Sequence, residues 1–187
     1  MIGFACCGSF CTLSKAMVEM EVLSKRFEIL PIVSPAVAAT DTRFGKAKDF
    51  LVLMEAITGH TPIDTIADAE PLGPAHPLEA LVIAPCTGNT LAKLANGITD
   101  TAVTMAAKAH LRNGKPLIIA LASNDALSAN LRNIGTLLAR KQVYFVPLGQ
   151  DDPISKPHSL VCDFGKIPHT LKAALEGKQL QPLLLRG

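Results

Sequence analysis

The 187-residue sequence has no tryptophan and one tyrosine, and charged residues make up only 18% of it. So few aromatic side chains leave little on which unpaired bases could stack, and a formal net charge of +2 provides no basic footprint for a phosphate backbone. We therefore expect no nucleic-acid partner. No continuous apolar stretch reaches the length of a membrane span, so we expect no membrane partner and a cytoplasmic location.

The five cysteines lack the spacing of a metal site or a redox pair. They form no C-x-x-C motif, and their number is odd, which favours reduced thiols in a reducing compartment. The histidines are scattered without ligand spacing, so we expect surface or loop positions and no metal. The cysteines are Cys6, Cys7, Cys11, Cys86 and Cys162, and the histidines are His60, His76, His110, His158 and His169.

Short apolar runs alternate with amphipathic helical patterns along the chain. Continuous rather than alternating hydrophobicity is typical of parallel strands that helices cover on both faces. The pattern predicts an α/β fold with three layers: a doubly wound, open parallel sheet of the flavodoxin-like or Rossmann-like class, in a single domain, 1–187. The expected strands are 2–6, 29–33, 81–84, 117–121 and 143–146, and the expected helices are 12–25, a helix between Thr42 and Gly59, 89–95, 101–111 and 129–141.

Three segments interrupt this alternation. Residues 62–77 predict a long loop with a short strand near 63–67, and residues 149–157 predict a lid or interface loop. Residues 177–187 are too apolar for a free tail and are expected to dock on their own subunit or a neighbour. Because 49% of the residues are hydrophobic, we expect subunit interfaces and a homo-oligomer.

Small and hydroxylated residues follow three of the expected strands. Residues 84–90 combine Pro85 and Gly88 with polar side chains, which suits a flat heterocycle, although Asn89 or Thr90 could simply cap a helix. Residues 121–127 form a similar turn. The carboxyl ends of parallel strands share one edge, so these turns predict one ligand site.

The turn after the first strand, Gly8-Ser9, opens a helix where a phosphate would be favoured; an ordinary capped helix is the alternative. It is not a G-x-G-x-x-G motif, and the second strand is followed by Ser34-Pro35 rather than an acidic residue. This pattern favours a mononucleotide over NAD.

These three turns resemble, in order and separation, the motifs of the homo-oligomeric flavin-containing cysteine decarboxylase family, including its P-A-S-A-N-T signature. At 85–90 this chain differs from the signature, because Cys86 and Gly88 replace small residues of it. Four further blocks are more closely similar to the dipicolinate synthase B-subunit family of spore-forming bacteria. They lie at 40–46, 69–74, 106–114 and 149–153.

The resemblance implies an FMN-binding flavoprotein assembled as a trimer or dodecamer, with flavin near the subunit interface. The family's phosphate-binding positions correspond to Gly8, Ser9 and Phe10, and Ser34 would meet the phosphate or ribityl chain. The remaining positions would line the isoalloxazine ring or close the site: Pro85, Cys86, Thr87, Asn89, Thr90, Ala122 and Ser123.

The resemblance also implies the reaction: oxidation of a dihydrodipicolinate-type precursor to dipicolinate during sporulation, in the mother cell. The partner would be a nicotinamide-binding A subunit that carries NAD(P). A flavin-free accessory subunit is an alternative. Decarboxylation is a third possibility, but residues 121–127 have lost the proline and both methionines of the decarboxylase pattern P-A-M-N-x-x-M, and the decarboxylase histidine has no counterpart.

A dicarboxylate substrate needs cationic groups, and guanidinium is the best of them. We expect Arg43, Lys108, Arg112 and Asn124 to bind substrate, although Lys108 and Arg112 could be solvated surface charges on one helix face. Arg43 and Asp41 are the catalytic candidates. Asp41 could act as a base or cap a helix.

Overall fold

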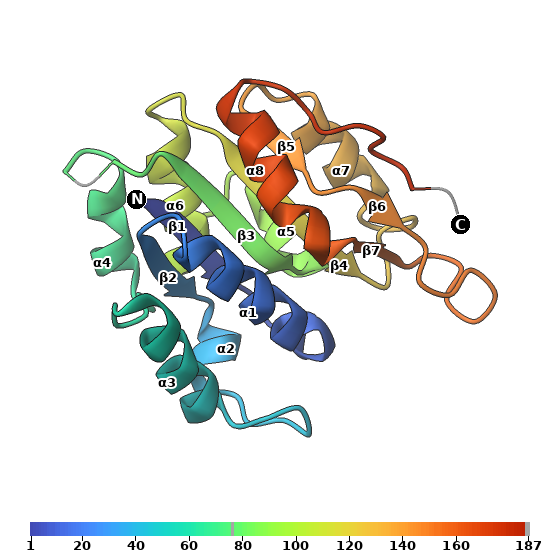
Figure 1. Ribbon diagram of the computed structural model, residues 1–187. Helices are drawn as coiled ribbons and strands as arrows, with labels where there is room; N and C mark the ends of the chain where they lie inside the picture. The colour runs from blue at the N-terminus through green and yellow to red at the C-terminus, as the bar shows by residue number, and fades with distance from the viewer. Residues whose placement is uncertain (76, 186–187) are drawn as a thin grey trace.

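Five parallel strands form the core of a seven-stranded sheet in the computed structural model, which describes residues 1–75 and 77–185 (Figure 1). Their order across the sheet is β2-β1-β3-β4-β5. Every residue of β1, β3 and β4 is buried, as continuous hydrophobicity predicts for strands covered on both faces. The strands are β1 (Ile2–Cys6), β2 (Ile29–Val33), β3 (Ala80–Cys86), β4 (Leu117–Ser123) and β5 (Val143–Phe145).

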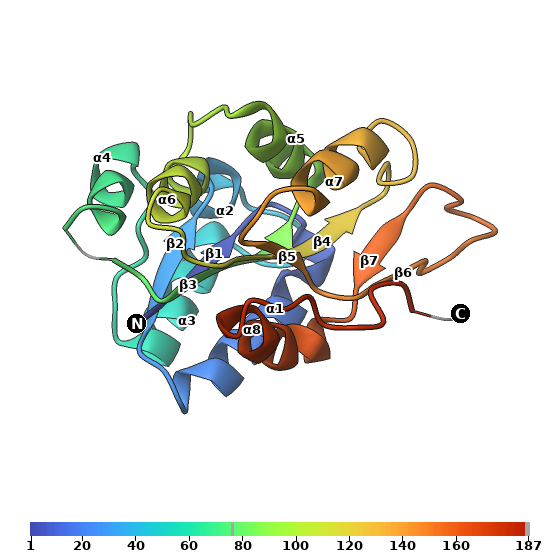
Figure 2. The ribbon, with the colours of Figure 1, turned by 90° about the horizontal axis from the view of Figure 1, so that it is seen from above.

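Helices cover both faces of this sheet (Figure 2). One layer contains α1 (Phe10–Ser24), α3 (Ala47–Thr58) and α8 (Ile167–Leu175). The opposite layer contains α4 (Ile66–Ala69), α5 (Gly88–Asn96), α6 (Ala102–Leu111) and α7 (Leu131–Leu138). The three-layer, doubly wound fold predicted from the sequence is confirmed.

Local sequence explains where the helices pack and end. In α1 the buried residues recur every three or four positions, so one stripe faces the sheet: Thr12, Leu13, Ala16, Met17, Met20 and Leu23. Helix α3 stops at Gly59, which adopts a left-handed φ of 74° and donates its N–H to the Glu55 carbonyl at 2.8 Å. The short α2 (Pro35–Ala39) begins at Ser34, whose Oγ accepts the Val37 N–H.

The sheet is not wholly parallel, which the sequence did not predict. The two short strands β6 (Leu148–Gly149) and β7 (Leu160–Cys162) are antiparallel to each other, and β7 is antiparallel to β4. Strand β4 is long enough to serve two partners, because its first half pairs with β5 and its last two residues pair with β7. This extension lies beside the carboxyl end of β4, where the ligand turn was predicted.

Other segments also differ from expectation. Among the described residues of 62–77, α4 and a 3₁₀ turn (Glu70–Leu72) form, and the expected strand near 63–67 is reduced to a bridge between Ile63 and Ile32. Helix α8, preceded by a 3₁₀ turn at Phe164–Lys166, was not predicted. His110 is fully buried in α6 rather than exposed, and burial lowers its pKa. His76 lies outside the described residues.

The C-terminal segment docks on its own chain as far as Leu185. The Leu148 N–H donates to the Leu183 carbonyl, and the Leu185 N–H donates to the Leu148 carbonyl, both at 2.8 Å. Gln179 bonds the backbone of Phe145 twice, accepting from its N–H at 2.8 Å and donating to its carbonyl at 2.7 Å. The apolar character of 177–185 is thus explained by contacts with β5 and β6.

Candidate functional site

A cavity of about 740 Å³ lies at the carboxyl edge of the sheet. Its walls come from the turns that follow β1, β3 and β4, from the segment between α2 and α3, and from the segment between β6 and β7. The three polar turns predicted from the sequence therefore meet at one cavity. The predicted residues among its lining are Gly8, Ser9, Phe10, Arg43, Thr87, Asn89, Ala122, Ser123 and Asn124.

The first turn of α1 forms one wall. A helix leaves its first N–H groups without carbonyl partners, and the N-terminus carries a partial positive charge. The Ser9 side chain does not cap these groups; its Oγ accepts the Thr12 hydroxyl at 2.9 Å, and the Thr12 N–H donates to the Ser9 carbonyl at 3.0 Å, so Phe10 and Cys11 carry the N–H groups that this turn leaves open. By contrast, Thr87 caps α5 and Thr101 caps α6. The start of α1 is therefore available to an anion in the cavity.

Gly88 forms a second wall, at the start of α5. A Cβ atom at this position would lie 2.5 Å from Ser123 Oγ, 2.6 Å from Asn130 Nδ2 and 2.8 Å from Asp125 Oδ1. A side chain here would have to displace these polar groups, so glycine lets the backbone of α5 lie close against them.

The groups that Gly88 faces form a connected polar cluster. Ser123 and Asn130 both donate to the Asp125 carboxylate, and Asn133 donates to Asn130 Oδ1 at 2.9 Å. The cluster joins β4 to the start of α7. Asp125 belongs to the turn 121–127 expected from the sequence, whereas Asn130 and Asn133 were not expected at the site; Asn133 is a buried polar residue of α7 (Leu131–Leu138), and Asn130 directly precedes that helix.

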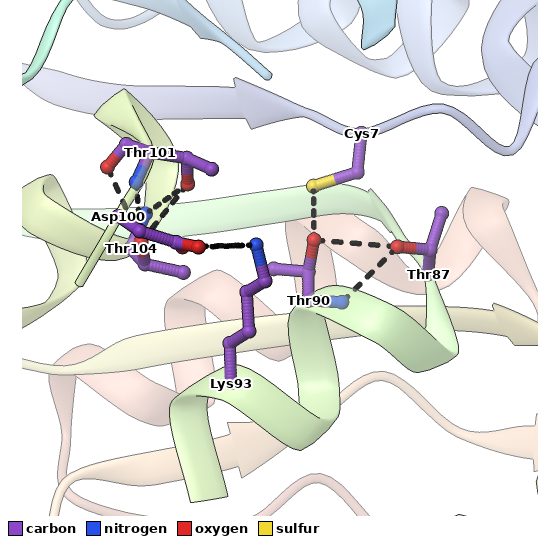
Figure 3. A network of polar contacts seen from close by, with 7 residues as sticks. All are labelled: Cys7, Thr87, Thr90, Lys93, Asp100, Thr101 and Thr104. Atoms are coloured by element: carbon purple, nitrogen blue, oxygen red, sulfur yellow. Dashed lines mark hydrogen bonds and ion pairs between the residues drawn. The ribbon is translucent and has the colours of Figure 1, made fainter. Parts of the chain in front are cut away.

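Four predicted flavin-binding residues are not among the described residues that line the cavity. Pro85 and Cys86 are buried within β3, and Thr90 donates its hydroxyl to Cys7 Sγ at 3.3 Å (Figure 3). Ser34 caps α2 instead. These four residues therefore support the turns from within the fold rather than facing the cavity.

Burial explains why neither Cys7 nor Cys86 has the character of a catalytic nucleophile. Burial raises the pKa of Cys7 to about 11 and that of Cys86 well above its usual range. The Thr87 hydroxyl donates to Thr90 Oγ1 at 3.2 Å, and Thr90 in turn donates to the Cys7 sulfur (Figure 3). This relay ties the start of α5 to the end of β1.

Arg43 lines the cavity, but Asp41 does not belong to the described lining. The Arg43 guanidinium lies 4.9 Å from the centre of the Phe44 ring, which also lines the cavity. Asp41 Oδ1 accepts the N–H of Ala47, the first residue of α3, at 2.9 Å. This hydrogen bond is the capping role that the sequence left open for Asp41.

Lys108 and Arg112 lie elsewhere. They line a separate cavity of about 350 Å³ with Arg140, at the ends of α5, α6 and α7. Cations at helix C-termini offset the negative end of the helix dipole. Within one chain, the structure does not bring them to the cavity at the carboxyl edge of the sheet.

The segment between β6 and β7 contributes three lining side chains that were not predicted, namely Asp151, Lys156 and Ser159. They reach the cavity because β7 pairs antiparallel with the end of β4. A lid or interface loop was expected at 149–157, and the structure places this segment beside the cavity.

Comparison with known proteins identifies the family. The model of the family described as Flavoprotein matches residues 8–172, which span nearly the whole sheet and its helices. The chain belongs to the Flavoprotein family.

Across the described residues, none of the helices has the length and apolar character needed to cross a membrane, and no three His, Cys, Asp or Glu side chains gather as in a metal site.

Two similar proteins match over nearly their full length. The B subunit of dipicolinate synthase from Bacillus subtilis (strain 168) is 44% identical over 187 residues, which are 100% of this chain and 94% of the relative. The crystal structure of the corresponding B subunit from Bacillus halodurans C is also 44% identical. Its TM-score is 0.91, and the match covers 99% of this chain and 95% of that one.

A more distant structure shares the fold. The FMN-dependent cysteine decarboxylase SpaF has a TM-score of 0.70 at 24% identity, with 94% of this chain and 95% of that chain covered. The fold predicted from the motifs is thus shared with the flavin-dependent decarboxylases. The resemblance to the B subunit of dipicolinate synthase is confirmed.

Proposed function

We propose that this chain is the FMN-binding component of a dipicolinate-forming oxidoreductase, and that it acts with a nicotinamide-binding A subunit. The observation that carries the proposal is the cavity in which the uncapped start of α1 and the close-packed Gly88 turn meet at one sheet edge. Family membership and the 44% identity to a protein named as the B subunit of dipicolinate synthase support it.

The residues around the cavity fit an FMN molecule. The cavity volume of about 740 Å³ is within the range of ligand pockets for molecules of this size. The start of α1 offers backbone N–H groups to a phosphate, with Gly8, Ser9 and Phe10 beside it. Thr87, Asn89, Ala122 and Ser123 offer polar and small groups to a flat ring. When bound, FMN would supply the capacity to accept a hydride.

The protein itself would bind the substrate, orient it and shield it from water. Arg43 would pair with a substrate carboxylate, and its guanidinium lies over the ring of Phe44 at the cavity. Asn124, exposed at the end of β4, adds a hydrogen-bonding group on the same wall. Oxidation of a dihydrodipicolinate-type precursor would be favoured because the product ring is aromatic.

The assembly belongs to the proposal as well. The relatives are named as the B component of a synthase, which supports a partner A subunit that would carry NAD(P). Exposed apolar side chains on α1 and α3, namely Val18, Val22, Val52 and Leu53, are available to contacts between copies in a homo-oligomer such as a trimer or dodecamer. The setting would be the mother cell of a sporulating bacterium.

Titration of the purified chain with FMN and with riboflavin tests the proposal. We expect FMN to bind more tightly than riboflavin, because only FMN places a phosphate at the start of α1. In Ser9→Asp, a carboxylate would occupy that position and cap the helix, so the free energy of unfolding should hold or rise. Its affinity for FMN should fall roughly tenfold or more, while its affinity for riboflavin changes little.

Riboflavin serves as the matched control, since it lacks only the phosphate. If neither flavin binds the wild-type chain, the flavin-free accessory role replaces the proposal. Equal losses of both flavins in Ser9→Asp would place the phosphate elsewhere.

A further inference from the structure

The cavity has a second cation that the proposed flavin site does not use. Lys156 comes from the segment between β6 and β7, and Arg43 comes from the segment between α2 and α3. In Figure 1 these two segments lie on either side of the start of α1. The cavity therefore receives a cationic side chain from each of two separate walls.

Hydrogen bonds hold the backbone around Lys156. Asp152 accepts the Ser155 N–H on its carboxylate at 2.9 Å and the Lys156 N–H on its carbonyl at 2.8 Å. The Lys156 carbonyl accepts the Ser159 N–H at 3.0 Å. The Leu127 N–H, from the chain after β4, donates to the His158 carbonyl at 2.9 Å. These hydrogen bonds fix the position of the Lys156 backbone, from which its side chain extends.

An ion pair orients the side chain of Lys156 but leaves some of its hydrogen-bond donors without a partner in that pair. Its Nζ lies 2.9 Å from Asp151 Oδ2, and its side chain is 54% exposed. Hydrogen bonds from the Ser159 hydroxyl and from Lys156 lower the pKa of Asp151, so this carboxylate stays charged. An ammonium group has three donors, and the Asp151 contact occupies one of them. Two remain for an anion in the cavity.

We propose that Lys156 binds one carboxylate of a pyridine-type dicarboxylate while Arg43 binds the other. This inference rests on the proposed function and names how its substrate class is recognised. Carboxylates at positions 2 and 6 flank the ring nitrogen and diverge from each other, so the outer oxygens of each carboxylate can meet a different cation. Cations on separate walls can therefore pair with both carboxylates at once, and they would also discriminate against a monocarboxylate.

Calorimetric titration of the FMN-loaded chain, in buffer free of divalent metals, tests this pairing. The ligands are pyridine-2,6-dicarboxylate and pyridine-2-carboxylate. In Lys156→Met we expect the affinity for the dicarboxylate to fall roughly tenfold to a hundredfold, because one charge-assisted pair is lost. The affinity for the monocarboxylate should change little, since it can still pair with Arg43. Lys156→Arg should keep most of the preference for the dicarboxylate.

Lys166→Met is the matched control. Lys166 also forms an ion pair with an aspartate, Asp163, at 3.8 Å, but it is not among the described residues around the cavity. This variant should bind both ligands as the wild type does.

Three results would overturn the clamp: equal losses for both ligands in Lys156→Met, no loss for either, or no dicarboxylate binding by a chain that does bind FMN. A fall in FMN affinity instead would assign Lys156 to the phosphate. Failure of the proposed function looks different, because then the wild-type chain would not take up FMN at all.

Discussion

Gly88 is the residue at which the cavity tolerates least change. An added methyl group would overlap Ser123, Asn130 and Asp125, whose polar atoms lie within 2.8 Å of its position and hydrogen-bond one another. We expect Gly88→Ala to lower the free energy of unfolding by about 1–3 kcal/mol, because the hydrogen-bonded side chains of Ser123, Asp125 and Asn130 must shift to make room for the methyl group. FMN affinity should fall with it. Urea unfolding and flavin titration measure the two effects.

Gly135 offers the matched control for this substitution. It lies in α7, and a Cβ atom there would meet nothing within 4 Å. Gly135→Ala should therefore raise the free energy of unfolding by about 0.5–1 kcal/mol and leave flavin affinity unchanged. If both variants behave alike, the close packing at Gly88 is not what shapes the cavity.

The residues that the sequence could predict are those adjacent to strands in the chain. Gly8, Ser9 and Asn89 follow apolar runs, and parallel strands bring such turns to one edge. Lys156 and Asn130 reach the cavity region through tertiary pairing of β7 and packing of α7, which no local pattern records. Lys108 and Arg112 line a different cavity within one chain, because charge type alone does not indicate which end of a helix faces the site.

The short antiparallel strands β6 and β7 were harder to predict than the parallel strands. The parallel strands β1 and β2 begin and end where the apolar runs do, whereas β6 and β7 have no periodicity to detect. Their place is decided by pairing with β4 and with the C-terminal segment. A short strand of this kind depends on its neighbours for its stability.

Gln179 shows how the C-terminal segment supports β5. Its side chain donates to and accepts from the backbone of Phe145, a fully buried residue of β5. We expect Gln179→Ala to lower the free energy of unfolding by about 1–3 kcal/mol, because two backbone groups lose their partner.

Thermal or urea unfolding measures this loss. Gln150→Ala is the comparison, since Gln150 makes one hydrogen bond, to the exposed Pro157 carbonyl, and should cost about 1 kcal/mol or less. Equal effects of the two substitutions would mean that the C-terminal segment does not stabilise β5.

For the whole molecule, the buried thiols predict how stability depends on pH. Cys6, Cys7, Cys86 and Cys162 are buried, and burial raises the pKa of each above its ordinary value. The pKa of Cys7 rises from 9.0 to about 11. As pH rises through 9, the unfolded chain loses thiol protons that the native chain keeps. The unfolded state then binds fewer protons, so the free energy of unfolding falls with rising pH.

Each such thiol contributes a slope of about 1.4 kcal/mol per pH unit where only the unfolded chain is ionised. Urea unfolding of wild type and Cys86→Ala from pH about 8 to about 10.5 isolates one of them, because lysine and tyrosine titrate equally in both proteins. The variant starts less stable, since it leaves a small cavity in the core. Its stability should nevertheless fall less steeply, and the two curves should converge. Parallel curves would show that the thiol of Cys86 ionises as readily in the native sheet as in the unfolded chain.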